Sequence, residues 1–263
     1  MFSEITSKNN DQLKYLRKLS SKSFRDSEET FAIEGTKLFL EAVKNDLPFK
    51  QIFITKEWLE NNAGLNSDYV IALAEKNVTV MMVTALILST VSSLQKPEGI
   101  IGILPKVCVT PGIFKRYVLL EDVQDPYNVG TIIRTADAAG FDCVVTSART
   151  ADIYNEKVLR GSMGSVFHLP IYQAESLLDY VKQLKNQPIT IIGTSLTGSS
   201  LWERENLTGS FAMVMGNESQ GMSDEMSKCC DILLKIPIFG QAESLNVATA
   251  AGIIMYDLIR DFK

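Results

Sequence analysis

The sequence has a single histidine, His168, and its four cysteines show no CxxC spacing. Zinc sites and disulfide frameworks need such residues in clusters, so we expect neither a metal nor a disulfide in this chain. Apolar Phe167 and Leu169 flank His168, and we interpret it as a structural residue rather than as a catalytic base. Buried free thiols are expected at Cys108, Cys143, Cys229 and Cys230.

Long apolar runs, common nucleotide-binding loops and a positive net charge are also missing. No run of eighteen apolar residues occurs, so we expect no membrane span. The polar N-terminus, MFSEITSKNN, lacks the apolar core of a signal peptide, which favours a cytoplasmic protein. Neither GxGxxG after a strand nor GxxxxGK[ST] is present, so a nucleotide-like cofactor would need another binding geometry. The net charge of −5 provides no general attraction for nucleic acid.

Positive charge is nevertheless concentrated near the N-terminus. The first twenty-five residues contain six Lys or Arg side chains and two acidic ones. We predict a short basic helix over residues 11–20, which would form a modest basic arm. The arm is a candidate RNA contact, and a solvated helix face is the alternative interpretation.

Two series of alternating strand-like and helix-like segments predict two α/β domains. The first series occupies residues 1–104. Pro105, Pro111 and Gly112 indicate a linker over residues 105–115, and the second series occupies residues 116–263. Its continuous apolar strands predict a parallel sheet with helices on both faces. These predicted strands are Tyr117–Leu120, Cys143–Thr146, Ile189–Gly193, Phe211–Met215 and Ile232–Ile236.

The stretch Ile236–Gly252 organises the second series. The strand Ile232–Ile236 is stopped by Pro237, a loop of small and polar residues follows, and a helix is predicted to start near Ser244. Backbone N–H groups and a helix N-terminus could meet a polar ligand in the loop Phe239–Ser244. An ordinary strand–turn–helix connection, with Ser244 as the N-cap of the helix, explains the same pattern equally well.

Polar residues also follow two other predicted strands. One cluster is Glu121–Ala136, whose Arg134 lies among apolar and small residues and so suggests an anion or polar ligand nearby. Another is Met215–Gly221, in which Gly216 permits a close backbone approach and Glu218 follows in a turn. Ligands of parallel α/β sheets gather at the carboxyl ends of strands, so we expect these clusters and the Ser244 loop to converge on one site.

Three segments carry a family resemblance. NVGTIIRTADAAGF, VMGNESQGM and IPIFGQAESLNVATAAGI resemble, in order and spacing, the three motifs of the SpoU (TrmH-like) RNA ribose methyltransferases. RGSMGSVFHLP and IIGTSL look like the same family, so that the resemblance runs from about residue 116 to the end. In the first series, FAIEGTKLFLEAV and KPEGIIGIL resemble a small ribosomal-protein-like α/β sandwich domain that precedes the catalytic domain in many members and is associated with RNA binding.

The resemblance implies a parallel-sheet domain with a deep trefoil knot in the C-terminal stretch, an exception to the usual topology rules. It implies a homodimer with its active site near the interface. It also implies transfer of a methyl group from S-adenosylmethionine to an RNA ribose 2′-hydroxyl, with ribosomal RNA favoured over transfer RNA. The cofactor-binding positions carried over are Thr194, Gly216, Asn217, Ile236, Ile238 and Leu245. The active-site positions carried over are Asn128, Arg134, Glu218, Ser244 and Asn246.

The family's usual proposal makes the arginine a general base, which is demanding because the unperturbed pKa of arginine is about 12.5–13.8. Alternatively, Arg134 could clamp a phosphate and lower the pKa of the hydroxyl by its charge. Glu218 could orient Arg134, while Ser244 and Asn246 hold the ribose. Two further interpretations are a non-catalytic RNA-binding or ribosome-assembly module and a small-molecule methyltransferase.

Overall fold

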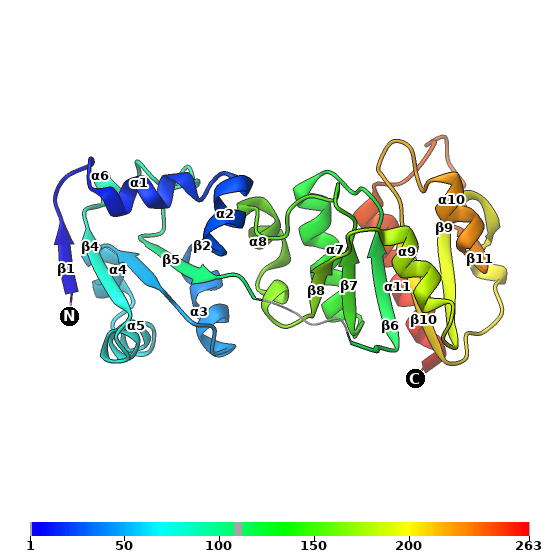
Figure 1. Ribbon diagram of the computed structural model, residues 1–263, viewed down its shortest axis with the longest axis horizontal. Coiled ribbons are helices and arrows are strands. Elements are labelled where there is room, and N and C mark those ends of the chain that lie inside the picture. The colour runs from blue at the N-terminus through cyan, green and yellow to red at the C-terminus, as the bar shows by residue number, and fades with distance from the viewer. Residues whose placement is uncertain (1, 108–111, 263) are drawn as a thin grey trace. The chain divides into compact units, whose positions relative to one another are not determined.

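The computed structural model describes residues 2–107 and 112–262 (Figure 1). Cys108 and Pro111, which the sequence interpretation assigned to a buried thiol and to the linker, lie outside these residues. The chain forms two compact units. The N-terminal unit comprises Met1–Val107 and Tyr154–Phe167, and the C-terminal unit comprises Cys108–Ile153 and His168–Lys263.

The N-terminal unit is built on a five-stranded sheet in the order β1-β4-β3-β5-β2, in which only β5 runs antiparallel to its neighbours. The strands are β1 (Phe2–Ile5), β2 (Thr30–Glu34), β3 (Gln51–Ile54), β4 (Thr79–Val83) and β5 (Ile100–Pro105). The helices are α1 (Asp11–Lys18), α2 (Lys22–Glu28), α3 (Thr36–Lys44), α4 (Lys56–Asn61), α5 (Leu65–Glu75), α6 (Ala85–Leu88) and α8 (Glu156–Ser162).

Each face of this sheet has its own apolar core, because successive strand residues point to opposite faces. On β2, Phe31 and Ile33 enter the core that α3 and α4 cover, and Ala32 packs against the other core. That second core includes Leu13 and Leu16 of α1. The predicted basic helix at residues 11–20 is therefore confirmed, and it is amphipathic.

The second part of this unit comes from a segment between two strands of the C-terminal unit. Leu159 of α8 is 1% exposed and belongs to the core beneath α3. The Tyr154 hydroxyl accepts a hydrogen bond of 3.0 Å from the Val107 N–H. A Cβ atom at Gly164 would lie 2.8 Å from the Cβ of Glu41, so the segment packs too closely there for a side chain. The order of the segments along the chain did not predict that Tyr154–Phe167 would belong to the N-terminal unit.

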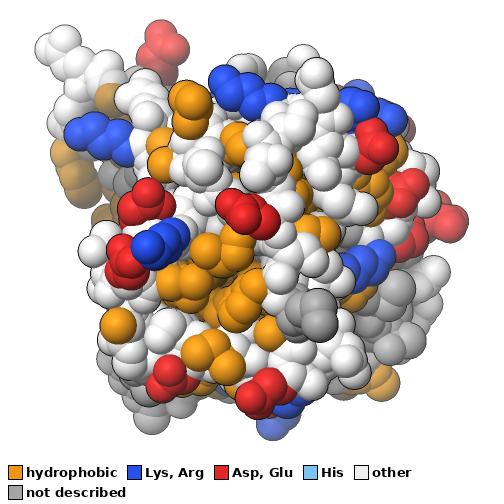
Figure 2. Space-filling model, turned by 90° about the vertical axis from the view of Figure 1, so that its left-hand side faces the viewer, with side chains coloured by type: hydrophobic (Ala, Val, Ile, Leu, Met, Phe, Trp, Pro, Cys, Tyr) orange, Lys and Arg blue, Asp and Glu red, His pale blue; other side chains and the backbone are white. Residues whose placement is uncertain are grey.

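The basic arm is largely engaged within the N-terminal unit. Lys14 pairs with Asp11, and the Arg25 side chain is buried and donates to the carbonyl oxygens of Leu19 and Ser20. The face of the unit shown in Figure 2 carries apolar side chains at its centre, and both acidic and basic side chains surround them. Among the described residues, this face therefore carries no uniform positive surface.

The C-terminal unit is a six-stranded sheet in the order β11-β9-β10-β6-β7-β8, and every neighbouring pair is parallel. The predicted parallel sheet is thereby confirmed. Its strands are β6 (Arg116–Leu120), β7 (Cys143–Thr146), β8 (Ile171–Gln173), β9 (Ile189–Ser200), β10 (Ser210–Met215) and β11 (Ile232–Lys235). Its helices are α7 (Pro126–Ala138), α9 (Leu177–Leu184), α10 (Asp224–Cys229) and α11 (Val247–Ile259).

Helices cover both faces of this sheet (Figure 1). Tyr117 and Leu119 of β6 are buried in the core shared with α9 and α10. Val118 and Leu120 are fully buried and point to the other face. Helices α7 and α11 pack against each other on that face.

A buried ion-pair network ties the connection after β9 to the end of α11. Arg204 Nε lies 2.6 Å from Asp257 Oδ2, and Arg204 Nη1 lies 2.5 Å from Asp261 Oδ2. The three side chains are only 4%, 6% and 5% exposed, respectively. Burial alone would raise the pKa of Asp261, but hydrogen bonds from Arg204 and from the Leu207 N–H outweigh it and lower that pKa.

Across the described residues, no helix is long and apolar enough to span a membrane. The same residues contain no group of three or more His, Cys, Asp or Glu side chains that could hold a metal ion. His168 Nδ1 lies 3.2 Å from Oδ2 of Asp137, a residue of α7. Cys143 is buried and free, and Cys229 and Cys230 are free and partly buried. Burial raises the pKa of the Cys143 and Cys230 thiols to about 12, which keeps both unreactive.

Candidate active site

Three of the five predicted active-site side chains form one hydrogen-bonded chain. Asn128 Nδ2 donates to Glu218 Oε1 at 3.2 Å, and Asn246 Nδ2 donates to Asn128 Oδ1 at 2.9 Å. The three residues follow β6, β10 and β11, respectively. Asn128 and Asn246 are 118 positions apart in the sequence. We call them the carboxylate–amide cluster. The expected convergence of polar residues at the carboxyl edge of the sheet is therefore observed for these three.

Glu218 holds the start of α7 in place. Its carboxylate accepts hydrogen bonds from the backbone N–H groups of Gln124 at 3.1 Å and Asp125 at 3.0 Å. Burial by itself raises the pKa of Glu218, but the backbone donors and Asn128 outweigh it, so the pKa is lowered. Glu218 is therefore an ionised acceptor that is poorly suited to take up a proton.

The carboxylate also determines how the two amides are oriented. An ionised Glu218 can only accept, so Asn128 must turn its Nδ2 toward it and its Oδ1 toward Asn246. Asn246 Oδ1 in turn accepts from the N–H groups of Ala248 at 2.9 Å and Thr249 at 3.2 Å. Asn246 is thus the N-cap of α11, and the sequence prediction that Ser244 caps this helix is wrong. The first N–H groups of a helix have no partner within the helix, and Asn246 lies directly before the first turn, where its side chain can accept from two of them.

A tight hairpin follows β10. Asn217 and Gly221 exchange two backbone hydrogen bonds of 2.9 Å. Asn217 Oδ1 accepts from the N–H groups of Ser219 and Gln220, and its Nδ2 donates to the Asp122 carbonyl at 2.8 Å. A Cβ atom at Gly216 would lie 2.2 Å from the backbone of Gly221, so only glycine allows the hairpin to close here.

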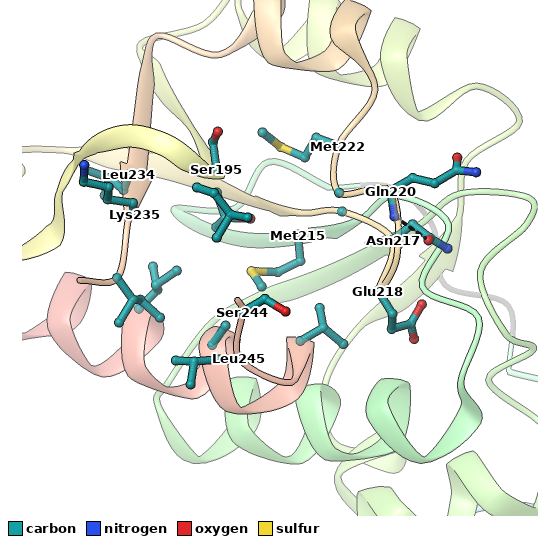
Figure 3. A pocket seen from close by; sticks show the side chains of 18 of the residues that line it. Ser195, Met215, Asn217, Glu218, Gln220, Met222, Leu234, Lys235, Ser244 and Leu245 are labelled. Carbon is teal, nitrogen blue, oxygen red and sulfur yellow. Dashed lines mark hydrogen bonds between the residues drawn. The ribbon is translucent and has the colours of Figure 1, made fainter. Parts of the chain in front are cut away.

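A pocket of about 460 Å³ opens beside the cluster (Figure 3). Strand β9 contributes one wall. Successive residues of β11 pair with Gly193 and then with Ser199 of β9, so Thr194–Gly198 have no partner on β11, and Thr194, Ser195 and Leu196 line the pocket. The other walls are the hairpin after β10 and the connection from β11 to α11. All six predicted cofactor-binding residues line the pocket: Thr194, Gly216, Asn217, Ile236, Ile238 and Leu245.

Two apolar side chains of the pocket wall are left unusually exposed. Leu196 is 66% exposed and Leu245 is 38% exposed. Exposed apolar side chains in a concave site are those that a bound ligand would cover. Sequence reasoning did not select Leu196, because the apolar strand was predicted to end at Gly193 and the extra β9 residues had no periodic signal.

The remaining two predicted active-site residues differ in their placement. Ser244 lines the pocket together with Glu218. Arg134 is exposed on α7, six positions after Asn128, and its side chain makes no hydrogen bond or ion pair with residues 2–107 and 112–262. The suggested contact in which Glu218 orients Arg134 is not formed within this part of the chain; Glu218 binds Asn128 and backbone N–H groups instead.

Two family models and several curated relatives match this chain. Residues 115–256 match the model of the SpoU rRNA Methylase family, and residues 10–102 match the MRM3-like substrate binding domain. The 23S rRNA (guanosine(2553)-2′-O)-methyltransferase RlmP of Bacillus subtilis is 36% identical over 259 residues, which are 97% of this chain and 98% of that protein. A putative TrmH family tRNA/rRNA methyltransferase of Staphylococcus aureus is 34% identical over 54% of this chain and 58% of its own length.

Solved structures show the same likeness. The crystal structure of an rRNA methyltransferase from Sinorhizobium meliloti has a TM-score of 0.86 and 30% identity, and the match covers 100% of this chain and 99% of that one. An AdoMet-bound structure of an rRNA methyltransferase from the same organism has a TM-score of 0.85, 30% identity and the same coverage.

Proposed function

The chain belongs to the SpoU rRNA methylase family, and we propose that it transfers the methyl group of S-adenosylmethionine to a ribose 2′-hydroxyl of ribosomal RNA. The observation that carries the proposal is the position of the carboxylate–amide cluster at the rim of the pocket. Such a site can hold a ligand of cofactor size and an acceptor group side by side. A ribosomal substrate also favours the cytoplasmic location expected from the sequence.

The pocket has the properties that S-adenosylmethionine requires. Leu196, Ile238 and Leu245 offer apolar surface, and Thr194 and Ser244 add hydroxyl groups. Gly216, which also lines the pocket, lets the hairpin after β10 close tightly against the pocket wall. When bound there, the cofactor supplies an electrophilic methyl group. Thr194, Gly216, Asn217, Ile236, Ile238 and Leu245 remain our proposed binding set, with Asn217 acting mainly through the hairpin that it holds closed.

The acceptor ribose would be held by Ser244 and by the N–H groups of Asn128 and Asn246 that remain unused within the cluster. Glu218 positions these groups rather than taking the proton, because its pKa is lowered. Arg134, which has no carboxylate partner among the described residues, is suited to clamp the phosphate next to the acceptor and to stabilise the developing negative charge on the 2′-oxygen. We therefore favour the phosphate-clamp role over the general-base role.

A homodimer and a knotted C-terminal stretch form part of the proposal. Because Arg134 lies about 240° around α7 from Asn128, the two side chains leave the helix in different directions. A dimer with its active site near the interface would let the Arg134 side chain complete the acceptor site of the second copy. We also propose that residues 1–104 bind the RNA substrate, that residues 105–115 are a linker, and that residues 116–263 catalyse the transfer.

Gly216→Ala is expected to lower the affinity for S-adenosylmethionine about tenfold or more, because a Cβ atom there overlaps backbone that cannot move aside. Calorimetric titration of the purified protein measures this effect. Gly240→Ala is the matched control: it lies on the neighbouring loop, and its Cβ would have nothing within 4 Å. Equal affinity of both variants for S-adenosylmethionine would contradict the proposed role of Gly216 in the binding site.

Methyl transfer is expected with unmodified 23S rRNA transcripts and not with transfer RNA. The relative of B. subtilis is named for guanosine 2553 of 23S rRNA, so the equivalent guanosine is the first nucleotide to test. A transcript carrying 2′-deoxyguanosine at that position lacks the acceptor and should remain unmethylated. A protein that binds S-adenosylmethionine and RNA without transferring a methyl group to either RNA class would instead favour the non-catalytic RNA-binding module.

A further inference from the structure

We propose that Arg149 binds a backbone phosphate of the RNA beside the acceptor nucleotide, a substrate-positioning role that rests on the function proposed above. Arg149 lies in the loop that follows β7. Strand β7 pairs with β6 on the side away from β10, and the strands run parallel, so their carboxyl ends share one edge. The loop thus stands next to the carboxylate–amide cluster, on the side opposite the cofactor pocket.

The loop that carries Arg149 is held firmly against the end of β6. The Ser147 N–H and the Thr150 hydroxyl both donate to the Leu120 carbonyl, at 3.0 and 2.9 Å. The Ala151 N–H donates to the Val123 carbonyl at 2.9 Å. Ser147 and Thr150 are 7% and 4% exposed. Arg149 therefore projects from a fixed support, which limits the entropy that binding would cost.

The Arg149 side chain is oriented but largely unused. Its Nη2 lies 2.5 Å from Asp122 Oδ2, and the side chain is 79% exposed. In the described part of the chain, it makes no other ion pair or hydrogen bond. A guanidinium group has five N–H donors in a planar fork, so most of its hydrogen-bonding capacity faces solvent. Its fork geometry matches two oxygens of a phosphate.

Asp122 links Arg149 to the active site. The Asp122 carbonyl accepts the Asn217 Nδ2 that anchors the hairpin after β10. The next residues of the same turn, Gln124 and Asp125, donate their N–H groups to Glu218. A phosphate on Arg149 would therefore lie within reach of a ribose placed at the cluster, and the RNA backbone would run from the acceptor site across β6 toward β7.

The acidic side chains at this edge do not oppose a phosphate as strongly as their number suggests. Glu218 accepts from backbone and Asn128, as described above. Glu121 accepts from the Ser223 N–H at 3.0 Å and the Ser223 hydroxyl at 2.7 Å, and Asp125 accepts from the Tyr127 N–H at 2.8 Å. These carboxylates are each hydrogen-bonded within the protein, whereas most of the Arg149 guanidinium is exposed to solvent.

Arg149→Ala is the test, with unmodified 23S rRNA transcript as substrate and saturating S-adenosylmethionine. We expect KM for the RNA to rise about tenfold at low salt, with kcat within about twofold of wild type. The slope of log affinity against log salt should become shallower by about 0.7–0.9, the effect of one lost phosphate contact. Arg149→Lys should restore the slope, because it keeps the charge, but only part of the affinity, because it lacks the fork.

Arg116→Ala is the matched control. Arg116 also faces an aspartate, Asp142, with 3.9 Å between Nε and Oδ2, but it begins β6 and so lies at the opposite edge of the sheet. Its KM and salt slope should equal those of wild type. An unchanged salt slope in Arg149→Ala would overturn the inference. So would a loss of S-adenosylmethionine binding and thermal stability, which would mean that Arg149 only supports Asp122.

The inference and the proposed function can fail separately. Equilibrium binding of the transcript reports the salt slope even without methyl transfer, so an inactive wild type with a slope that depends on Arg149 refutes the function alone. An active wild type whose RNA affinity does not depend on Arg149 refutes the inference alone. Absence of any RNA binding overturns both.

Discussion

Replacing Arg134 with alanine is expected to slow methyl transfer to ribosomal RNA by a factor of about 10³, with unchanged affinity for S-adenosylmethionine and unchanged thermal stability. Arg134 is exposed on α7, and its side chain makes no hydrogen bond or ion pair with residues 2–107 and 112–262. Removing it therefore leaves no buried partner unsatisfied. The cofactor pocket is formed by other elements, so binding there should not respond to the substitution.

The expected loss is large because Arg134 is the cation proposed to act on the reacting oxygen. Attack on the methyl carbon requires the 2′-hydroxyl to lose its proton, and a nearby positive charge stabilises the oxygen as negative charge develops. Such an interaction is stronger in the transition state than in the bound substrate, so kcat should fall together with kcat/KM. Arg134→Lys should retain part of the rate, because it keeps the charge but not the planar fork.

Single-turnover kinetics with radiolabelled cofactor would measure the chemical step, and calorimetry would verify that cofactor binding persists. Arg116→Ala serves again as the control, because it removes an arginine from the far edge of the same sheet. Near-normal turnover by Arg134→Ala would refute both the clamp and the general-base role. Mixed dimers of Arg134→Ala and Gly216→Ala chains that recover activity would support the sharing of Arg134 between protomers.

Arg204→Ala is expected to destabilise the C-terminal unit by about 3–5 kcal/mol, because it leaves Asp257 and Asp261 buried without their common partner. Both carboxylates are nearly inaccessible, at 6% and 5%. The melting temperature should fall by about 10 °C. Differential scanning calorimetry would measure the change. The network joins the connection after β9 to the end of α11, so the variant should also detach the C-terminal helix early in unfolding.

Arg260→Ala is the matched control for this effect. Arg260 pairs with the same two aspartates, at 3.1 and 3.8 Å, but is 49% exposed. Exposed ion pairs contribute about 0–1 kcal/mol, so its loss should be small. Equal destabilisation by both substitutions would contradict the importance of burial.

The contribution of the network should depend on pH in a defined direction. The pKa of Asp261 is lowered in the folded state. Its stabilising contribution is therefore complete above the unfolded aspartate pKa of about 3.9 and disappears as the pH falls through the lower folded value. The stability difference between wild type and Arg204→Ala should narrow below about pH 4. A difference that stays constant down to the acid limit would mean that Asp261 is not the titrating partner.

Much of the site was predictable because its residues follow strands with strong apolar signals. Val118–Leu120 and Met213–Met215 are continuous apolar runs, so the ends of β6 and β10 could be located from hydrophobicity alone. Parallel pairing then predicted that Asn128 and Glu218 would approach each other, and they are hydrogen-bonded.

Other features depended on contacts that no local pattern encodes. Ser244 and Asn246 are both good N-cap residues by type. In the structure Asn246 caps α11 through Ala248 and Thr249, and its hydrogen bond to Asn128, across 118 positions, holds its side chain in place. The extension of β9 to Ser200 arises from pairing with β11 around an irregular register, whereas the sequence beyond Gly193 is polar and small. Glu218 was expected to orient Arg134, but nearby backbone N–H groups satisfy it first.

The sequence by itself therefore determined the two α/β series, the parallel sheet and the family motifs, because hydrophobic period and residue type act over a few neighbouring positions. Only the tertiary structure decided which polar groups are partners. It placed Arg204 between two buried aspartates, Leu159 in the core of the N-terminal unit and Arg149 beside Asp122. The physical reason is that hydrogen bonds and ion pairs act at about 3 Å and are selected by burial, and neither distance nor burial is a property of a segment on its own.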